Sequence, residues 1–144
     1  MRPRRLWAVR RPATSAEIAL YEAAREAREH AYAPYSEFPV GAALRLEDGT
    51  VVAGANIENA SFGLTVCAER SAVFTAAFSG ARSFSAIAVA GHDGLSTLLP
   101  CGGCRQVLAE FAPSIPVVHL YDGEVVVETL DVLLPDAASS ALPA

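Results

Sequence analysis

Residues 67–121, CAERSAVFTAAFSGARSFSAIAVAGHDGLSTLLPCGGCRQVLAEFAPSIPVVHLY, decide the fold, because apolar strands alternate with helices along them. The expected elements are, in order, a helix over 67–79, a strand over 84–90, a helix over 101–111 and a strand over 116–121. Such alternation requires crossover connections. Because right-handed crossovers put both helices on one face of the sheet, we expect their N-termini to be neighbours.

Two hairpins and a further helix complete the expected fold. Thr14 and Glu17 form a capping-box pattern, so a helix is expected to start there and to end before Pro34. Asp-Gly pairs, which supply the positive φ of tight turns, join the strands of each hairpin. These strands are expected over 40–46 and 51–56, and over 116–121 and 124–129. The expected fold class is α/β, a three-layer α/β/α sandwich around a mixed five-stranded sheet.

Size and charge limit what the chain can do. Its 144 residues, 52% of them apolar, fit one domain, expected over 14–135 between an N-terminal arm (1–13) and a C-terminal tail (136–144). All eleven basic residues are arginines and five lie in the arm, which leaves six arginines against sixteen acids elsewhere, a net charge of −10. Because such a body repels phosphates, nucleic acid is an unfavoured partner. The basic arm is expected to be a flexible, solvated terminus.

No membrane segment or export signal is expected. The longest unbroken apolar run, residues 86–90, is far shorter than the ~20 residues of a membrane-spanning helix. Arginines and Pro12 interrupt the N-terminus before an apolar stretch of about 7–15 residues, the length that a signal peptide needs. The expected compartment is therefore the cytoplasm, where thiols stay reduced and three cysteines indicate a metal site or catalysis.

The three cysteines can share one metal ion. Cys101 and Cys104 lie three residues apart in the first turn of a helix and so share a face, and Cys67 begins the neighbouring helix. Helix N-termini stabilise thiolates, which favours zinc. Three protein ligands leave one tetrahedral position open for water, and an open position distinguishes a catalytic zinc from a structural one.

Charged neighbours of the cysteines have expected roles in the same chemistry. Glu69 lies two residues after Cys67 and can reach a zinc-bound water, where a carboxylate carries protons to the substrate. Three thiolates leave the zinc site with a negative charge. Arg70 and Arg105 are therefore expected to donate hydrogen bonds to the sulfurs and offset that charge. The alternative is that both arginines pair with surface carboxylates.

Two other arrangements of the cysteines stay open. A closed structural zinc site needs a fourth ligand, and His92 is the strongest candidate because its loop leads to Pro100. His119 lies within a strand and is expected to be a core or edge histidine, and His30 ends a helix. In the other arrangement the three cysteines are ordinary buried residues without a metal.

The motifs Cys67-Ala68-Glu69 and Pro100-Cys101-Gly102-Gly103-Cys104 resemble those of the zinc deaminases of the cytidine deaminase superfamily. Three further segments are similar to the deaminases of free nucleosides: 35–44 (YSEFPVGAAL), 56–59 (NIEN) and 101–111 (CGGCRQVLAEF). They follow the family's order and spacing, and the resemblance covers roughly residues 15–135. Several matching segments in one chain make the resemblance highly specific.

The resemblance implies a zinc hydrolase that deaminates cytidine and deoxycytidine to uridine and deoxyuridine with release of ammonia, a reaction of pyrimidine salvage. By the same resemblance Cys67, Cys101 and Cys104 are the zinc ligands. Glu69 corresponds to the proton shuttle, which protonates the ring nitrogen beside the reacting carbon and then the leaving amine. The cofactor that the resemblance implies is Zn²⁺.

The resemblance also implies a substrate-binding set and an assembly. Asn56 and Glu58 correspond to the pair that binds the ribose, and Phe38 corresponds to the aromatic residue that flanks the base. Ala68 is expected to help position the hydroxyl or the departing amine. Family members of this short type are commonly homotetramers, so a homo-oligomer is expected.

Two positions depart from the family pattern. No aromatic residue follows Leu133-Leu134-Pro135, where the family often has one that contributes to a neighbouring subunit's site. Phe62 stands where many relatives carry tyrosine, so a phenolic hydrogen bond near the ribose is absent. These departures suggest weaker substrate binding or a shifted preference.

Two other functions remain open. The chain could deaminate another nucleoside, such as a nucleoside antibiotic, or a base within a polynucleotide. The basic arm favours the polynucleotide, whereas the acidic body and the ribose motif oppose it. The other possibility is a non-catalytic binding module that zinc stabilises, and it predicts that Glu69→Gln changes neither zinc content nor function.

Overall fold

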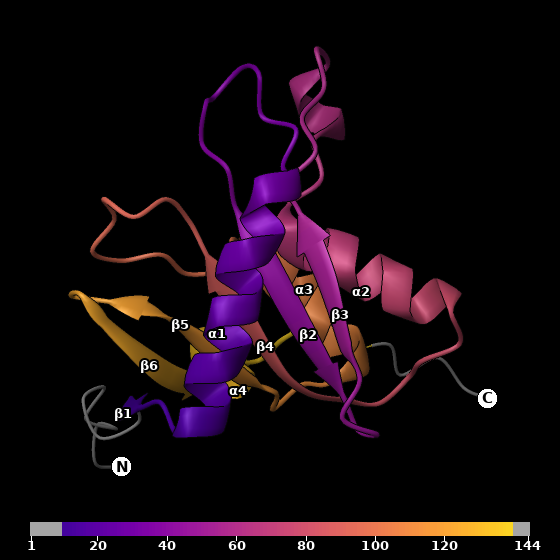
Figure 1. Ribbon diagram of the computed structural model, residues 1–144. Coiled ribbons are helices and arrows are strands. Elements are labelled where there is room, and N and C mark those ends of the chain that lie inside the picture. Colours follow the sequence, from indigo (N-terminus) through magenta and orange to yellow (C-terminus); the bar gives the residue numbers. More distant parts are fainter. Residues whose placement is uncertain (1–9, 140–144) are drawn as a thin grey trace.

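The middle layer of the protein is a mixed sheet with the strand order β1-β6-β5-β4-β2-β3 (Figure 1). The computed structural model describes residues 10–139. The strands are β1 (Arg11–Pro12), β2 (Gly41–Leu46), β3 (Val51–Ala55), β4 (Phe84–Ala90), β5 (Pro116–Tyr121) and β6 (Glu124–Thr129). β4 and β5 pair in parallel, and the other neighbours pair antiparallel.

Helices cover both faces of this sheet, which confirms the predicted three-layer α/β/α sandwich (Figure 1). They are α1 (Ser15–Ala27), α2 (Ala68–Phe78), α3 (Gly102–Phe111) and α4 (Leu130–Leu133), with 3-10 turns η2 (Arg28–His30) and η3 (Phe62–Leu64). α1 lies on one face, and α2 and α3 lie on the other. Within residues 10–139, no helix has the length and hydropathy that crossing a membrane requires.

The two faces of the sheet carry different side chains. The α1 face is built from small residues, and a Cβ at Gly41 would come within 2.0 Å of the Ala24 carbonyl oxygen. Only glycine therefore lets α1 approach β2 this closely. On the opposite face, larger side chains such as Leu44, Ile87 and Leu108 fill the space between the sheet, α2 and α3. Both cores exclude water almost completely, which stabilises the fold.

Two crossovers place the starts of α2 and α3 next to each other, as predicted. β3 and β4 both pair antiparallel with β2, so β3, β4 and β5 run in the same direction. The connections β3-α2-β4 and β4-α3-β5 proceed across the sheet in one sense, and right-handed crossovers then put both helices on one face. A Cβ at Gly54 would lie 2.4 Å from the Ala68 carbonyl oxygen, so the first turn of α2 rests directly on β3.

The sheet has six strands, and the prediction of five missed β1. Arg11 pairs with Val127, so part of the predicted flexible arm is an edge strand; residues before Arg10 lie outside the described part. Adjacent strand residues point to opposite faces. Arg10 accordingly bonds to Glu128 (3.3 Å) on one face, and Arg11 bonds to Glu17 of α1 (2.7 Å) on the other. The pairing of β1 with β6 joins positions far apart in the chain, so no local sequence pattern predicts it.

The capping box at the start of α1 is confirmed and is also an ion pair. Glu17 accepts hydrogen bonds from the Thr14 amide (3.0 Å) and from Arg11 (2.7 Å), and only 6% of Glu17 is exposed. Hydrogen bonding to Arg11, helped by Thr14, lowers the pKa of Glu17 to about 2 although burial opposes this. The folded protein therefore holds this carboxylate ionised well below its ordinary pKa of 4.5.

Glu17→Gln is expected to lower the free energy of unfolding by about 2 kcal/mol at pH 7. Because the pKa is lowered in the folded state, this stabilisation is present above about pH 4.5 and is lost as the pH falls towards 2. Denaturant titrations at pH 7 and pH 3 measure the difference, which should shrink at pH 3. Glu22→Gln, on an exposed position of the same helix, is the control, and an equal loss of stability in both variants contradicts the expectation.

Candidate active site

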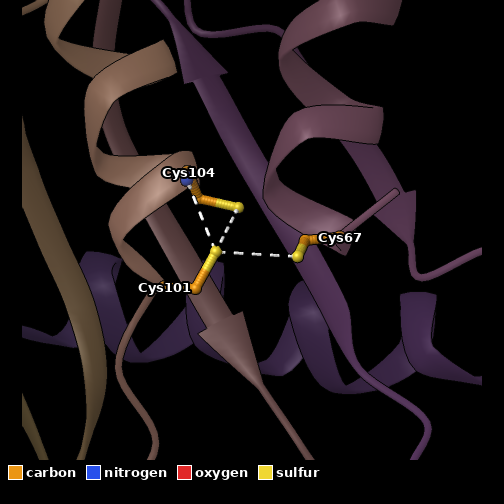
Figure 2. Close-up of side chains that lie close together, drawn as sticks. All are labelled: Cys67, Cys101 and Cys104. Atoms are coloured by element: carbon orange, nitrogen blue, oxygen red, sulfur yellow. Dashed lines mark hydrogen bonds between the residues drawn. The ribbon is translucent and has the colours of Figure 1, made fainter. Parts of the chain in front are cut away.

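Three cysteine sulfurs point towards one another from the first turns of α2 and α3 (Figure 2). Cys67 is the N-cap of α2, Cys101 is the N-cap of α3, and Cys104 lies in the first turn of α3. The Cys101 sulfur lies 3.7 Å from that of Cys67 and 3.5 Å from that of Cys104, and all three lie within 4.8 Å of one another. The neighbouring helix starts therefore bring together residues that are 34 positions apart in the chain.

This arrangement fits a tetrahedral metal. Thiolates bound at the usual Zn–S distance of about 2.3 Å lie about 3.8 Å apart around a tetrahedral ion. Within residues 10–139, the cluster of metal-ligand side chains holds these three cysteines and no histidine. His119 is instead fully buried and bonded to Glu128 (2.8 Å), and the ring of His92 lies against Phe38. The geometry therefore favours an open three-ligand site over a closed site with a fourth histidine.

The surroundings of Cys67 favour its thiolate. Hydrogen bonding with the Cys104 thiol, supported by Arg70 and Cys101, lowers the pKa of Cys67 to about 5. Nη2 of Arg70 donates a hydrogen bond to the Cys67 sulfur at 3.2 Å, which is the contact that the sequence predicts. The same thiol pair, together with burial, raises the pKa of Cys104.

Arg105 differs from the expectation. Its Nε donates to the Pro100 carbonyl (2.8 Å) and its Nη1 donates to the Leu133 carbonyl (2.8 Å), and no contact with a sulfur is found in the described part of the chain. Arg105 lies four residues after Cys101 and so shares its side of the helix, but the Pro100 and Leu133 carbonyls take up its donors. Arg105 therefore fastens the backbone just before Cys101 to α4.

A pocket of about 180 Å³ opens beside the sulfurs. Its lining is Val40, Asn56, Thr65, Cys67, Ala68, Glu69, Val89, Leu98, Leu99 and Cys101. Glu69 is only 4% exposed, and burial raises the pKa of Glu69 to about 7. A carboxyl group of this pKa can both accept and donate a proton near neutral pH. The pocket therefore combines a metal-ligand cluster with a proton-transfer group.

The predicted ribose-binding residues lie in different places. Asn56 lines the pocket, but both ends of its amide bond to the backbone, because Oδ1 accepts from the Val40 amide and Nδ2 donates to the Phe38 carbonyl, each at 2.8 Å. Glu58 accepts from the amides of Tyr35 and Ser36 and lines a second, more open cavity. Both side chains thus hold the segment 35–40 in place beside the pocket.

Aromatic residues and leucines complete the surroundings. Thr65 lines both cavities, so they adjoin each other, and Phe62 lines the outer one with 73% of its surface exposed. Phe38 is half-buried and packs against His92. The sequence reasoning did not single out Thr65, Leu98 or Leu99 as pocket residues. The position of the two leucines directly before Pro100 was the signal that could have found them.

An open three-thiolate cluster beside a buried carboxyl group, on a three-layer α/β/α fold, defines a hydrolytic zinc site. A family model described as "Cytidine and deoxycytidylate deaminase zinc-binding region" matches residues 14–120. The chain belongs to this family, and zinc is the metal for which the three cysteines are arranged.

Individual relatives agree with this assignment. A protein of Sporosarcina psychrophila named cytidine deaminase is 50% identical over 117 residues, which cover 80% of this chain and 85% of the relative. The crystal structure of cytidine deaminase from Burkholderia pseudomallei has a TM-score of 0.80 and 51% identity, over 88% of this chain and all of that one. A more distant relative, blasticidin-S deaminase of Bacillus cereus, is 31% identical over 67% of this chain and 74% of its own.

Proposed function

We propose that this chain, through a domain over residues 14–135, hydrolyses cytidine and deoxycytidine to uridine and deoxyuridine with release of ammonia, as part of pyrimidine salvage in the cytoplasm. The observation that carries the proposal is the buried carboxyl group of Glu69 in the same pocket as the sulfurs of Cys67 and Cys101. The relatives named cytidine deaminase support the choice of substrate.

Glu69 carries the protons of the proposed reaction. Zinc, when bound to Cys67, Cys101 and Cys104, supplies Lewis acidity and makes water a stronger nucleophile at neutral pH. Glu69 accepts a proton from the attacking water and delivers it to the ring nitrogen beside the amine-bearing carbon. It then takes the proton of the hydroxyl group that has been added to this carbon and passes it to the amine, so that the C–N bond breaks, the carbonyl of uridine forms and ammonia leaves. Burial of Glu69 in the same pocket as the sulfurs places this carboxyl group beside the reacting water.

Other residues position the reactants. The hydrogen bond from Arg70 withdraws negative charge from the Cys67 sulfur and so strengthens the metal as a Lewis acid. Ala68 is fully buried at the start of α2 and forms the pocket wall between Cys67 and Glu69. Phe38 flanks the base. Asn56 and Glu58 bind the ribose and also hold the segment 35–40 beside the pocket.

Initial rates of ammonia release test the proposal. Cytidine, deoxycytidine, cytosine, cytidine monophosphate, a single-stranded oligonucleotide and blasticidin S are compared at equal concentration with the zinc-loaded protein. The two free nucleosides are expected to react at least about 100-fold faster than the oligonucleotide, because the small pocket beside the sulfurs and the acidic body disfavour a polyanion. Conversion of the oligonucleotide alone, or of blasticidin S alone, contradicts the proposal.

The assembly belongs to the same proposal, and we expect a homotetramer. Large apolar side chains are exposed on α2 and η3, among them Phe78 (95%), Phe62 (73%) and Leu64 (67%). Large exposed apolar side chains are typical of surfaces that pack against another copy. Light scattering after size exclusion is expected to give four chains for the parent and a smaller assembly for Phe78→Glu. A monomeric parent contradicts this expectation.

Arg70→Ala is expected to keep most of the zinc and to lower kcat about tenfold. Without the Arg70 guanidinium, the Cys67 sulfur keeps more negative charge, which weakens the Lewis acidity of the metal without removing a ligand. Zinc content by mass spectrometry and kcat for cytidine check the two statements. Arg82→Ala, at an exposed position just after α2, is the matched control. Equal kinetics of the two variants contradict a role for Arg70.

A further inference from the structure

His92 lies against Phe38, close to the pocket, and is not used by the proposed reaction. The ring of His92 meets the ring of Phe38 edge to face, with 5.1 Å between the centroids and 81° between the planes. Phe38 is tied to the pocket through its carbonyl, which accepts a hydrogen bond from Asn56. His92 therefore contacts the aromatic residue that the proposed function places beside the base.

The loop that carries His92 is fastened to α1. Oδ1 of Asp93 accepts hydrogen bonds from Arg25 (2.9 Å) and Arg28 (3.0 Å), and Arg28 also donates to the Gly91 carbonyl. Hydrogen bonding to Arg25 and then to Arg28 lowers the pKa of Asp93, so this carboxylate is ionised at neutral pH. Arg25 of α1 and Arg28 of η2 thus hold the residues on both sides of His92.

The histidine ring also has a fixed orientation within its own turn. Nδ1 of His92 accepts a hydrogen bond from the Gly94 amide at 3.2 Å. The preceding residue, Gly91, is buried so tightly that a Cβ there would lie 2.5 Å from Leu95 Cδ1 and 3.1 Å from Leu98 Cδ2. Leu98 lines the pocket, so the same compact loop supports the pocket wall and the ring of His92.

We propose that His92 is a positioning residue, whose ring edge holds Phe38 in the orientation that receives the base, and that Asp93 keeps His92 in place. This inference rests on the proposed function, which gives Phe38 its contact with the base. A ring that is held before the substrate arrives loses less conformational freedom on binding. The gain applies to the bound substrate and the transition state alike, so it lowers KM and leaves kcat unchanged.

Three variants separate the ring contact from a purely structural role of the loop. His92→Asn keeps an acceptor for the Gly94 amide but removes the ring. His92→Phe keeps the ring but removes the acceptor. Asp93→Ala removes the hydrogen bonds to Arg25 of α1 and Arg28 of η2. kcat and KM for cytidine are measured for each variant in the zinc-loaded protein, and His92→Asn is also combined with Phe38→Leu.

We expect His92→Asn to raise KM about 3- to 10-fold and to leave kcat within about twofold of the parent. The change in KM is the size expected for the loss of one aromatic pair. His92→Phe should restore KM, and Asp93→Ala should raise KM in the same direction. In the Phe38→Leu background, His92→Asn should have no further effect. If His92→Asn keeps the parent KM, the ring contact has no role and the inference is overturned. If His92→Phe raises KM while His92→Asn does not, His92 only caps its turn, and the inference is also overturned.

A second measurement decides the inference without relying on turnover. The ring proton signals of Phe38, assigned by their loss in Phe38→Leu, are used to follow the NOE between this ring and Gly91, where an added Cβ would lie 3.7 Å from Phe38 Cζ, in the parent and in His92→Asn. Loss of this NOE in His92→Asn supports the positioning, and an unchanged NOE overturns it. A parent that does not deaminate cytidine overturns the proposed function, and the NMR comparison then still decides whether His92 positions Phe38.

Discussion

Glu69→Gln is expected to keep one zinc per chain and to lose at least about 100-fold in kcat/KM for cytidine. Glutamine matches the size of the buried side chain but neither accepts nor donates a proton at neutral pH. The metal should stay because its ligands are the three cysteines and not Glu69. Zinc content by mass spectrometry and steady-state kinetics of the same preparation check both statements.

Glu110→Gln is the matched control for Glu69→Gln, because Glu110 is exposed on α3 and lies away from the pocket. It is expected to retain the parent kinetics. Activity of Glu69→Gln within a few-fold of the parent contradicts the assignment of the proton-transfer group. A binding module stabilised by zinc predicts that result, so the experiment also separates the two functions.

Cys104→Ser is expected to reduce bound zinc well below one ion per chain and to abolish measurable activity. A serine hydroxyl is not deprotonated at neutral pH and does not replace a thiolate as a zinc ligand. Cys104 is also fully buried between α3 and the sheet, so loss of the metal removes a cross-link between the starts of α2 and α3. The melting temperature should therefore fall together with the zinc content.

Chelation of the parent provides the control for this variant. Parent protein stripped of metal should lose its activity and regain it when zinc is added, whereas Cys104→Ser should not recover. X-ray absorption of the zinc-loaded parent is expected to show three sulfur neighbours and one lighter atom. Full zinc occupancy in Cys104→Ser, or four sulfur or nitrogen ligands from the protein in the parent, contradicts the open site.

The parts of the fold that depend on neighbouring residues could be predicted from the sequence. The strands over 84–90, 116–121 and 124–129 lie where the apolar runs and the turn at Asp122-Gly123 predict them. Both turn residues have a positive φ, 49° at Asp122 and 79° at Gly123, as a tight hairpin turn requires. The cysteine cluster could be predicted in the same way, because the order of strands and helices dictates which helix starts lie next to each other.

Contacts between distant segments could not be predicted in the same way. The hydrogen bonds of Arg105 with the carbonyls of Pro100 and Leu133 depend on where α4 packs, and four residues of helix leave no periodic pattern. The pairing of Phe38 with His92 joins two loops, whose conformations follow from tertiary packing and not from local propensity. The sequence predicts which residues carry the chemistry, and the structure shows which neighbours hold these side chains.

The edge strand β1 also imposes an order on events during synthesis. Arg11 pairs with Val127, so the residues near the start of the chain find their partner only after the last long strand has left the ribosome. Until then, the edge of β5 that β6 covers is free to pair with another chain. A chain that terminates before residue 124 therefore lacks β6, which covers the edge of β5 and is also the strand that β1 pairs with, and aggregation is the outcome that its open edge favours.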